Sequence, residues 1–291
     1  MSAPAPRAGG PARAGVLGHP IAHSLSPVLH RAAYASLGLT DWRYTSHDVT
    51  EDGLAGFVAG CGPEWAGLSL TMPLKRTVLG LLDAVEPLAE AVGAVNTLLF
   101  SAGGLKVGAN TDVYGIATAV RLAGADSGSS RPTGVIVGGG ATAASAVAAL
   151  GELGITRPAV LVRSKGRAGA VIRAANSMGV EPELVSLDSP RAGALVRSAD
   201  VVVSTIPGGA SDRLVPLVEG VRLGHGQVLL DVVYEGWPTA FPLAWRGAGG
   251  TAVPGSDMLL HQAVEQVRLM TGRSPAVEPM RTALDLALAG G

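Results

Sequence analysis

Short apolar runs alternate with longer amphipathic stretches along most of the chain, and this alternation is typical of α/β proteins whose strands are mainly parallel. In the first part of the chain, apolar runs of strand length are each followed by a segment with helical periodicity. The pattern predicts strands at 14–18, 42–47 and 65–71, helices at 26–37, 51–59 and 74–83, and a hairpin of 95–100 with 104–107.

A second strand–helix series follows the most loop-like interior segment, GADSGSSRP at 124–132, which is itself preceded by a helix beginning at Asp112. After Gly255 the pattern is helical to the end. Because the second sheet is complete by then, we expect these last helices to pack on the first domain. The series predicts strands at 134–137, 159–163, 183–186, 201–205, 228–233 and 250–253, and helices at 141–153 and 167–178.

Bulk composition indicates a globular protein and restricts its partners. The 291 residues exceed what one hydrophobic core usually serves, and 47% of them are hydrophobic, so two well-packed domains are expected. The formal net charge is −1 and no long basic block occurs, which gives no reason to expect nucleic acid or a membrane surface as a partner. No fourth-ligand pattern accompanies His19, His23 and His30, so no metal is expected.

Cysteine content and apolar segments indicate the compartment. The single cysteine, Cys61, cannot form an internal disulfide and lies in no activating pattern, which fits an inert thiol in a reducing compartment. No segment reaches the roughly 18 to 20 apolar residues of a membrane span. Residues 1–13 lack the apolar core of a signal peptide, and we expect them to be a flexible tail. A cytoplasmic location is therefore expected.

The segment VIVGGGATA, which joins a predicted strand to a predicted helix, fits the pattern G-x-G-x-x-A with Gly138, Gly140 and Ala143. The first glycine would permit the tight turn, the second the approach of a pyrophosphate, and the alanine close packing of helix on strand. Since a helix N-terminus also offers free N–H groups to phosphates, we interpret the loop as a dinucleotide site and not as a merely flexible turn. The expected contacts are Gly138, Gly139, Gly140, Ala141 and Thr142.

The end of the predicted strand 159–163 indicates which dinucleotide binds. NAD enzymes usually place Asp or Glu there for the ribose 2′-hydroxyl, and this chain has neither. It has RSKGR, whose cations suit a 2′-phosphate. A solvated surface loop is the alternative, but the position directly after the strand favours NADP. The predicted residues are Arg163, Ser164, Lys165 and Arg167.

Two polar segments, GHPIAHSLSP at 18–27 and GLSLTMPLK at 67–75, each lie between a predicted strand and a helix. Ser26 is expected to cap the helix that follows it, a role that explains Ser24 less well. Lys75 falls in the first turn of its predicted helix, where the helix dipole disfavours a cation. A proton-transfer role therefore suits this lysine better than a plain surface role.

Two further polar segments, AVNTL at 94–98 and GANTD at 108–112, bring amide and carboxylate groups to strand and loop ends. Asn110 is also explained by the support of a turn, and Asp112 by the capping of a helix. These segments alone leave a functional and a structural interpretation open.

Taken in order, these segments resemble the shikimate and quinate dehydrogenase family, over about residues 14–289. The four polar segments, the glycine loop, DVVYEGWPT and GSDMLLHQA follow one another as in that family, and the ordered set is far more specific than any one motif. The resemblance implies an N-terminal substrate domain and a Rossmann NADP-binding domain with the active site between them. The expected bounds are 14–111 with 256–291 for the substrate domain, and 112–255 for the Rossmann domain.

The resemblance also implies an activity and a role for each matching residue. The activity is the NADP-dependent, reversible reduction of 3-dehydroshikimate to shikimate in chorismate and aromatic amino-acid biosynthesis. Lys75 and Asp112 would form the catalytic pair, and Ser24 with Ser26 would bind the substrate carboxylate. Thr71, Asn96, Tyr234 and Gln262 would contact the substrate, and Val232, Gly255 and Met258 the nicotinamide end of the cofactor.

One position departs from the family pattern G-x-N-V-T-x-P-x-K, because Ser69 stands where the family usually has asparagine. Serine keeps a hydroxyl but loses the amide, which bears on the support of Thr71 or Lys75. The serine pair 24 and 26 resembles the shikimate-specific branch more than the quinate-using branch, whose second residue is often threonine.

Two alternatives remain for the function. One is a quinate/shikimate or aminoshikimate dehydrogenase that uses NAD, against which the basic residues after 159–163 argue. The other is a non-catalytic NADP-binding module, which has no need of the pair formed by Lys75 and Asp112. Both a monomer and a homodimer are compatible with the sequence.

Overall fold

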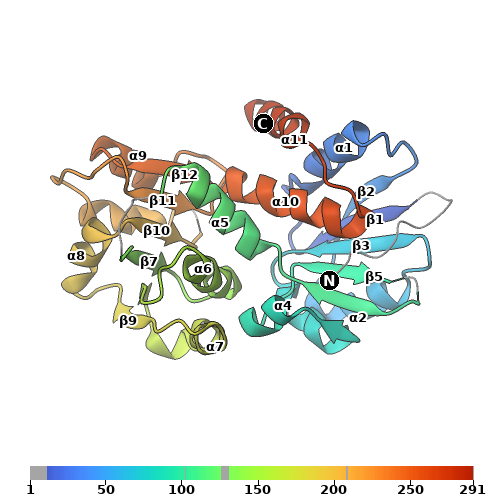
Figure 1. The fold of residues 1–291 in the computed structure, drawn as a ribbon, viewed down its shortest axis with the longest axis horizontal. Coiled ribbons are helices and arrows are strands. Elements are labelled where there is room, and N and C mark those ends of the chain that lie inside the picture. Colours follow the sequence, from blue (N-terminus) through green and yellow to red (C-terminus); the bar gives the residue numbers. More distant parts are fainter. Residues whose placement is uncertain (1–11, 102, 126–130, 208, 291) are drawn as a thin grey trace. The chain divides into compact units, whose positions relative to one another are not determined.

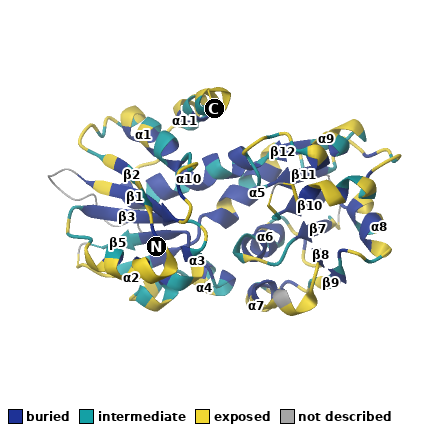
Figure 2. Ribbon diagram, turned by 180° about the vertical axis from the view of Figure 1, so that it is seen from behind, coloured by how far each residue is buried: buried dark blue, intermediate teal, exposed yellow. Residues whose placement is uncertain are grey.

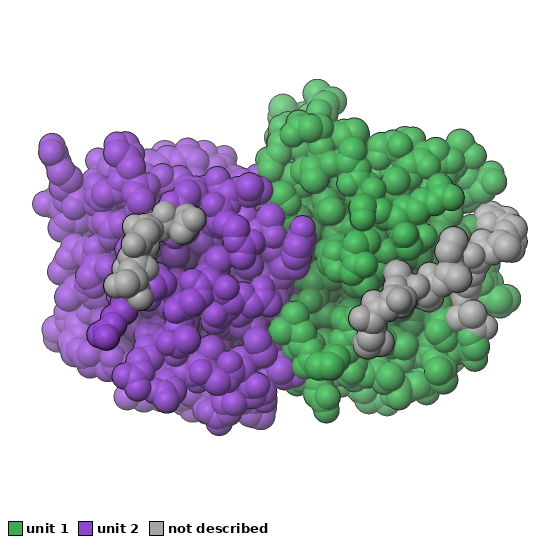
Figure 3. Space-filling view, viewed as in Figure 1, with its two compact units in different colours: residues 1–90, 94–111, 259–291 green, residues 91–93, 112–258 purple. Residues whose placement is uncertain are grey.

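The structure is a computed structural model that forms two compact units, coloured separately in Figure 3. The residues it describes are 12–101, 103–125, 131–207 and 209–290, without the side chain of Arg167. Unit 1 comprises residues 1–90, 94–111 and 259–291, and unit 2 comprises residues 91–93 and 112–258.

Unit 1 is built on a mixed sheet, drawn in blue to green in Figure 1. Its strands are β1 (Arg13–Gly18), β2 (Arg43–Asp48), β3 (Trp65–Leu70), β4 (Ala84–Val85), β5 (Thr97–Phe100) and β6 (Lys106–Ala109). Across the described residues the six strands lie in the order β2-β1-β3-β5-β6-β4. The pairs of β1 with β2 and β3 are parallel, and those of β5 with β3 and β6 are antiparallel.

Helices cover both faces of this sheet. They are α1 (Ser26–Ser36), α2 (Glu51–Ala59), α3 (Leu74–Thr77), the 3₁₀ helix η1 (Val78–Leu81), α4 (Pro87–Val92), α10 (Gly255–Thr271) and α11 (Val277–Ala289). Leu260 of α10 and Met280 of α11 are fully buried in one apolar cluster with Leu29 of α1. The expectation that the last helices return to the first domain is therefore confirmed. A second cluster, with Leu54 and Leu74, lies under α2 and α3.

Unit 2 has a fully parallel sheet with helices on both faces (Figures 1 and 2). The strands are β7 (Gly134–Val137), β8 (Ala159–Val162), β9 (Glu183–Ser186), β10 (Val201–Ser204), β11 (Val228–Asp231) and β12 (Thr251–Pro254). In the described part of the chain their order is β12-β11-β10-β7-β8-β9. This is the doubly wound dinucleotide-binding order, whose ligand lies at the switch point between the first strand, β7, and the fourth, β10.

The helices of unit 2 bury an almost wholly apolar strand set, as expected of a sheet that is covered on both faces. They are α5 (Asp112–Leu122), α6 (Ala141–Glu152), the 3₁₀ helix η2 (Lys165–Arg167), α7 (Gly169–Met178), α8 (Arg191–Ser198), the 3₁₀ helix η3 (Ser211–Leu217) and α9 (Ala240–Gly247). Within the described residues, no helix of either unit is long and apolar enough to cross a membrane.

Three predictions from the pattern need correction. The strand β1 starts at Arg13, whose N–H donates to Glu64 O at 2.8 Å, so the expected tail 1–13 is too long; its residues 1–11 lie outside the described residues. The predicted helix 74–83 is α-helical only through Thr77 and continues as η1, because Gly80 in its second turn weakens an α-helix. The predicted helix 167–178 begins at Gly169, after η2.

Candidate functional site

The glycine loop of unit 2 joins β7 to α6 through a turn that requires glycine. Gly138 has a φ of +124°, and a Cβ added there would collide with the Thr205 hydroxyl. Its N–H donates to Leu161 O at 3.0 Å, which fixes the loop against the neighbouring strand. A side chain at this position is excluded by backbone conformation and by space together.

The next part of the loop leaves room where a phosphate would lie. Gly140 adopts an extended conformation as the N-cap of α6, and a Cβ added to it would meet nothing within 4 Å. Ala143, in the first turn of the helix, is fully buried. The space beside Gly140 and the free N–H groups of the twelve-residue α6 therefore suit the pyrophosphate of a dinucleotide.

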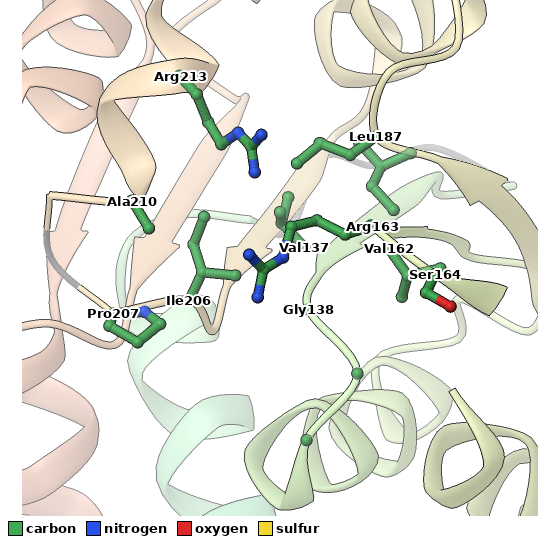
Figure 4. A pocket seen from close by; sticks show the side chains of 13 residues that line it. Val137, Gly138, Val162, Arg163, Ser164, Leu187, Ile206, Pro207, Ala210 and Arg213 are labelled. Carbon is green, nitrogen blue, oxygen red and sulfur yellow. The ribbon is translucent and has the colours of Figure 1, made fainter. Parts of the chain in front are cut away.

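A cavity of about 430 Å³ opens beside this loop, at the carboxyl ends of β7 and β8 (Figure 4). That volume lies within the range of small-molecule sites. Arg163 and Ser164 line it as the sequence predicts, whereas Lys165 does not. The side chain of Arg167 lies outside the described residues. Arg213 of η3 also lines the cavity, and sequence reasoning missed it.

The charge of Lys165 acts on a carboxyl group outside the cavity lining. The pKa of the Glu183 carboxyl on β9 is lowered, first by its hydrogen bond with Arg191 and also by the positive charge of Lys165. Glu183 accepts hydrogen bonds from Arg191 at 2.7 and 3.2 Å. Of the predicted cations, Arg163 therefore lines the cavity and Lys165 does not, and Arg213 from a separate segment joins Arg163 there.

At the other end of the sheet, a buried carboxylate organises the segment that carries Tyr234. Asp231 is fully buried and accepts hydrogen bonds from the Val233 N–H at 3.3 Å and the Thr239 hydroxyl at 3.4 Å. Burial raises the pKa of Asp231 to about 6. A Cβ added to Gly255 would collide with Val232 O, so the two backbones touch here. The backbone from Asp231 to Val233 is therefore held by the Asp231 carboxylate and by its contact with Gly255.

In unit 1, the loop after β1 presents the two predicted carboxylate ligands. The Ser26 N–H donates to the Ser24 hydroxyl at 3.4 Å, and α1 starts at Ser26 without a side-chain cap from Leu25. Ser26 is therefore not the cap that the sequence suggests, and Ser24 is the residue that supports the helix start. The buried Ser26 side chain instead hydrogen-bonds the phenol of Tyr44 on β2.

Asn96 lies at the centre of a buried hydrogen-bond network, with 2% of its surface exposed. Its Oδ1 accepts from the Thr111 N–H and the Thr97 hydroxyl, both at 2.8 Å. Its Nδ2 donates to the Thr111 hydroxyl at 2.9 Å and to Gln262 Oε1 at 3.4 Å. Gln262 Nε2 donates in turn to Leu259 O at 2.9 Å. Two predicted substrate ligands, Asn96 and Gln262, are thus brought together and oriented.

The comparisons with known proteins agree with this arrangement. The shikimate dehydrogenase substrate binding domain family matches residues 16–98, and the shikimate 5′-dehydrogenase C-terminal domain family matches residues 255–284. A shikimate dehydrogenase (NADP(+)) of Rubrobacter xylanophilus is 38% identical over 93% of this chain and 94% of its own. The chain belongs to the shikimate dehydrogenase family.

Solved structures of the family share the fold over almost their whole length. The shikimate dehydrogenase of Mycobacterium tuberculosis is 39% identical with a TM-score of 0.85, over 95% of this chain and 100% of that one. The Thermus thermophilus enzyme, solved in complex with NADP(H) and shikimate, is 30% identical with a TM-score of 0.80, over 95% and 99% of the two chains. The predicted fold class is thereby confirmed.

Thr71 and Lys75, two of the predicted site residues, follow β3. The Thr71 N–H donates to Leu17 O at 2.9 Å, and Lys75 O accepts from the Val95 N–H at 2.8 Å. A Cβ added to Gly18 would collide with the Thr71 methyl, so glycine at the end of β1 allows this close approach. Because α3 is a single turn, its dipole is small, and the dipole argument from the sequence loses its force.

The remaining predicted residues lie in unit 2 or at its start. Asp112 is the first residue of α5, 3% exposed, and directly follows Thr111 of the Asn96 network. Met258 is buried and Tyr234 is half-buried, with the pKa of its phenol raised by burial. The pairing of Lys75 with Asp112 stays a prediction, since the two residues belong to different units.

Sequence reasoning missed three residues that the structure places beside predicted ones: Tyr44, Gln266 and Arg213. Tyr44 lies in the predicted strand 42–47 and Gln266 in the predicted C-terminal helical segment, and both are almost completely buried. Their polar atoms join the hydrogen bonds around Ser69 and Asn96 through contacts between segments that are distant in the sequence. Arg213 lies in a segment to which the sequence assigned no element, so no pattern pointed to it. Across the described residues, no group of three or more His, Cys, Asp or Glu side chains is arranged to hold a metal ion.

Proposed function

We propose that this chain is an NADP-dependent shikimate dehydrogenase, which catalyses the reversible reduction of 3-dehydroshikimate to shikimate in chorismate and aromatic amino-acid biosynthesis. The observation that carries the proposal is the cavity beside the glycine loop, which is lined by arginines, one of them at the strand end where NAD enzymes usually have an acidic residue. The same chain also contains the buried hydrogen-bond network of Asn96. The relatives named shikimate dehydrogenase (NADP(+)) and the family structure with NADP(H) and shikimate support it.

Substrate binding is assigned to the polar groups of unit 1. Ser24 and Ser26 bind the substrate carboxylate, and Thr71, Asn96 and Gln262 contact its ring hydroxyls or carboxylate. The amides are already held by neighbours at 2.8 to 3.4 Å, so little ordering is needed when the substrate arrives. An analogue without a matching hydroxyl leaves such a group unpaired, which is how this site selects its substrate.

Proton transfer is assigned to Lys75, supported by Asp112. When bound, NADPH supplies the hydride to the carbonyl carbon of the ring. Lys75 then donates the proton, or the positive field, that the developing oxyanion requires. Asp112 hydrogen-bonds the same region and keeps the lysine oriented toward the reacting oxygen.

The residues of unit 2 fit NADP. The open space beside Gly140 accepts the pyrophosphate at the N-terminus of α6, and Arg163 reaches the 2′-phosphate. The segment that carries Val232, with Gly255 against it, forms a rigid backbone wall for the nicotinamide end.

The experiment is a spectrophotometric assay at the reduced-nicotinamide band, with the purified chain, shikimate or quinate, and NADP or NAD. Rapid reduction of NADP by shikimate, with much slower reduction of NAD, supports the reaction, the substrate and the cofactor together. Turnover with quinate or NAD as the preferred reactant contradicts the substrate or cofactor assignment while leaving the fold in place. No turnover with any combination contradicts the proposal as a whole.

We further propose a cytoplasmic enzyme, active as a monomer or a homodimer. The single cysteine supports a reducing compartment, and burial raises the pKa of the Cys61 thiol to about 11, which keeps it protonated and unreactive near neutral pH. Light scattering coupled to size exclusion measures the oligomeric state, and a tetramer or larger assembly would contradict this assignment.

A further inference from the structure

Two arginines from separate segments face one cavity in unit 2. Arg163 directly follows β8, whereas Arg213 lies on η3, after β10. Both line the cavity of about 430 Å³, and Figure 4 shows their guanidinium groups projecting into it from different walls. The fold thus brings together two cations that are far apart in the sequence.

Among the described residues that line this cavity, none is acidic and so none balances the two charges. The residues that share it with the arginines are mostly apolar, among them Leu187, Ile206 and Pro207. Within the described residues, no ion pair is formed by Arg163 or Arg213, whereas other arginines of unit 2, such as Arg157 and Arg191, pair with glutamates. Two guanidinium groups beside apolar walls, without a carboxylate, form a site for an anion.

The alternative is that a cation next to Arg163 in the sequence, and not Arg213, binds the anion together with Arg163. Lys165 is closest to Arg163 in the sequence, but it does not line the cavity, and its charge acts on Glu183. Arg213, unlike Lys165, lines the cavity together with Arg163.

We propose that Arg213 is a specificity-determining residue, which together with Arg163 binds the 2′-phosphate of NADP. This inference rests on the proposed function. Each guanidinium offers paired N–H donors that match two phosphate oxygens, so two arginines on different walls satisfy a dianion from two sides. A neutral adenine would stack on a guanidinium without neutralising either charge, and for this reason we assign Arg213 to the phosphate.

The test compares the binding of NADP and NAD by isothermal titration calorimetry in the wild-type chain and in Arg213→Ala. We expect Arg213→Ala to weaken NADP binding by about tenfold or more, because a charge-assisted contact to phosphate is lost, and to change NAD binding by less than about twofold. Arg157→Ala is the matched control, since it removes the same charge from an exposed ion pair of unit 2. It should leave both affinities unchanged.

Three results would count against the inference or its basis. Equal weakening of NADP and NAD by Arg213→Ala would place this arginine on the adenine or pyrophosphate, and unchanged binding of both would remove it from the site. The same titration with adenosine 2′,5′-bisphosphate and adenosine 5′-monophosphate repeats the comparison without the nicotinamide, and only the bisphosphate should respond to Arg213→Ala. If the wild-type chain binds neither NADP nor NAD, the proposed function fails instead.

Discussion

The Ser69 hydroxyl donates a hydrogen bond of 2.7 Å to Gln266 Oε1, and so ties strand β3 to helix α10 across 197 positions of sequence. The same hydroxyl accepts a hydrogen bond of 2.6 Å from the Tyr44 phenol. Gln266 Nε2 donates onward to Asn96 O at 3.1 Å and to the Thr97 hydroxyl at 2.9 Å. Ser69 thus connects the Tyr44 side of unit 1 to the Asn96 network.

Replacing Ser69 by alanine should therefore lower stability and disturb the substrate site together. Ser69→Ala leaves the Tyr44 phenol and Gln266 Oε1 buried without this partner, at a cost of about 1 to 3 kcal/mol in the free energy of unfolding. Because Gln266 also holds Asn96, we expect the KM for shikimate to rise more than kcat falls. Urea unfolding and steady-state kinetics measure the two effects.

The control for this change is Ser198→Ala, which removes an exposed serine hydroxyl from α8 of unit 2. It should alter neither the free energy of unfolding nor the KM by a measurable amount. If Ser69→Ala has an unfolding free energy and a KM equal to those of the wild-type chain, the connection through Ser69 has no energetic role.

Two glycines of the dinucleotide loop should respond differently to the same substitution. Gly138→Ala must place a Cβ at a φ of +124° and against the Thr205 hydroxyl, so we expect it to destabilise unit 2 and weaken NADP binding. Gly140→Ala meets open space at an ordinary φ of −84°, so stability should be kept while the added methyl weakens NADP binding. Thermal unfolding and NADP titration separate the two cases; full NADP affinity in Gly140→Ala would place the pyrophosphate elsewhere.

Removing the amine of Lys75 should reduce turnover far more than substrate affinity. For Lys75→Met we expect kcat to fall by about 10²- to 10⁴-fold, the usual range for general acid–base catalysis, with little change in the KM for shikimate. The control is Lys106→Met, which removes a lysine paired with Asp83 at 3.0 Å on another part of unit 1. A raised KM with intact kcat in Lys75→Met would assign this lysine to binding and not to catalysis.

Local pattern was enough to predict most of the fold, because the strands are continuous apolar runs and glycines mark their ends. The helix Glu51–Ala59 and the strand Gly134–Val137 lie at their predicted bounds. The pattern did not reveal α8 and α9, which are eight residues each and bury only a few side chains. Short helices of this kind depend on tertiary packing more than on their own sequence.

The sequence predicted the candidate site only where its residues directly follow predicted strands. Gly138 and Arg163 lie directly after strands, and strand ends in parallel sheets meet at one edge, so their neighbourhood follows from the sequence. Arg213 and Gln266 reach their sites through contacts made by distant segments, which no spacing rule encodes. The expected cap at Ser26 is wrong, because residue type alone does not say whether a helix starts at Ser26 or after it, and α1 starts at Ser26 itself.

The buried imidazole of His30 should make the chain sensitive to acid. Burial lowers the pKa of His30 from its ordinary value of 6.5 to about 4, although its ring also hydrogen-bonds Ser26 O at 2.9 Å. The ring stacks on Tyr44 with a centroid distance of 3.9 Å, and its Nε2 has no hydrogen-bond partner among the described residues. A proton added to Nε2 would find no acceptor among the described residues.

Because the pKa of His30 is lower in the folded chain, the free energy of unfolding decreases as the pH falls. Above pH 6.5 the neutral ring is the ordinary form in both states, so its full contribution to stability is present; as pH falls toward 4 the unfolded chain takes up the proton and the folded chain resists it. We expect a loss of up to about 3 kcal/mol in the free energy of unfolding across this window. His30→Phe keeps an aromatic ring on Tyr44 but cannot take up a proton. Between pH 7 and pH 4 its free energy of unfolding should therefore fall by less than that of the wild-type chain, the difference being most of this amount. The control His225→Gln, at an exposed position, should show the same pH dependence of the unfolding free energy as the wild-type chain. Urea unfolding at several pH values measures these curves, and parallel curves for His30→Phe and the wild-type chain would show that acid sensitivity arises elsewhere.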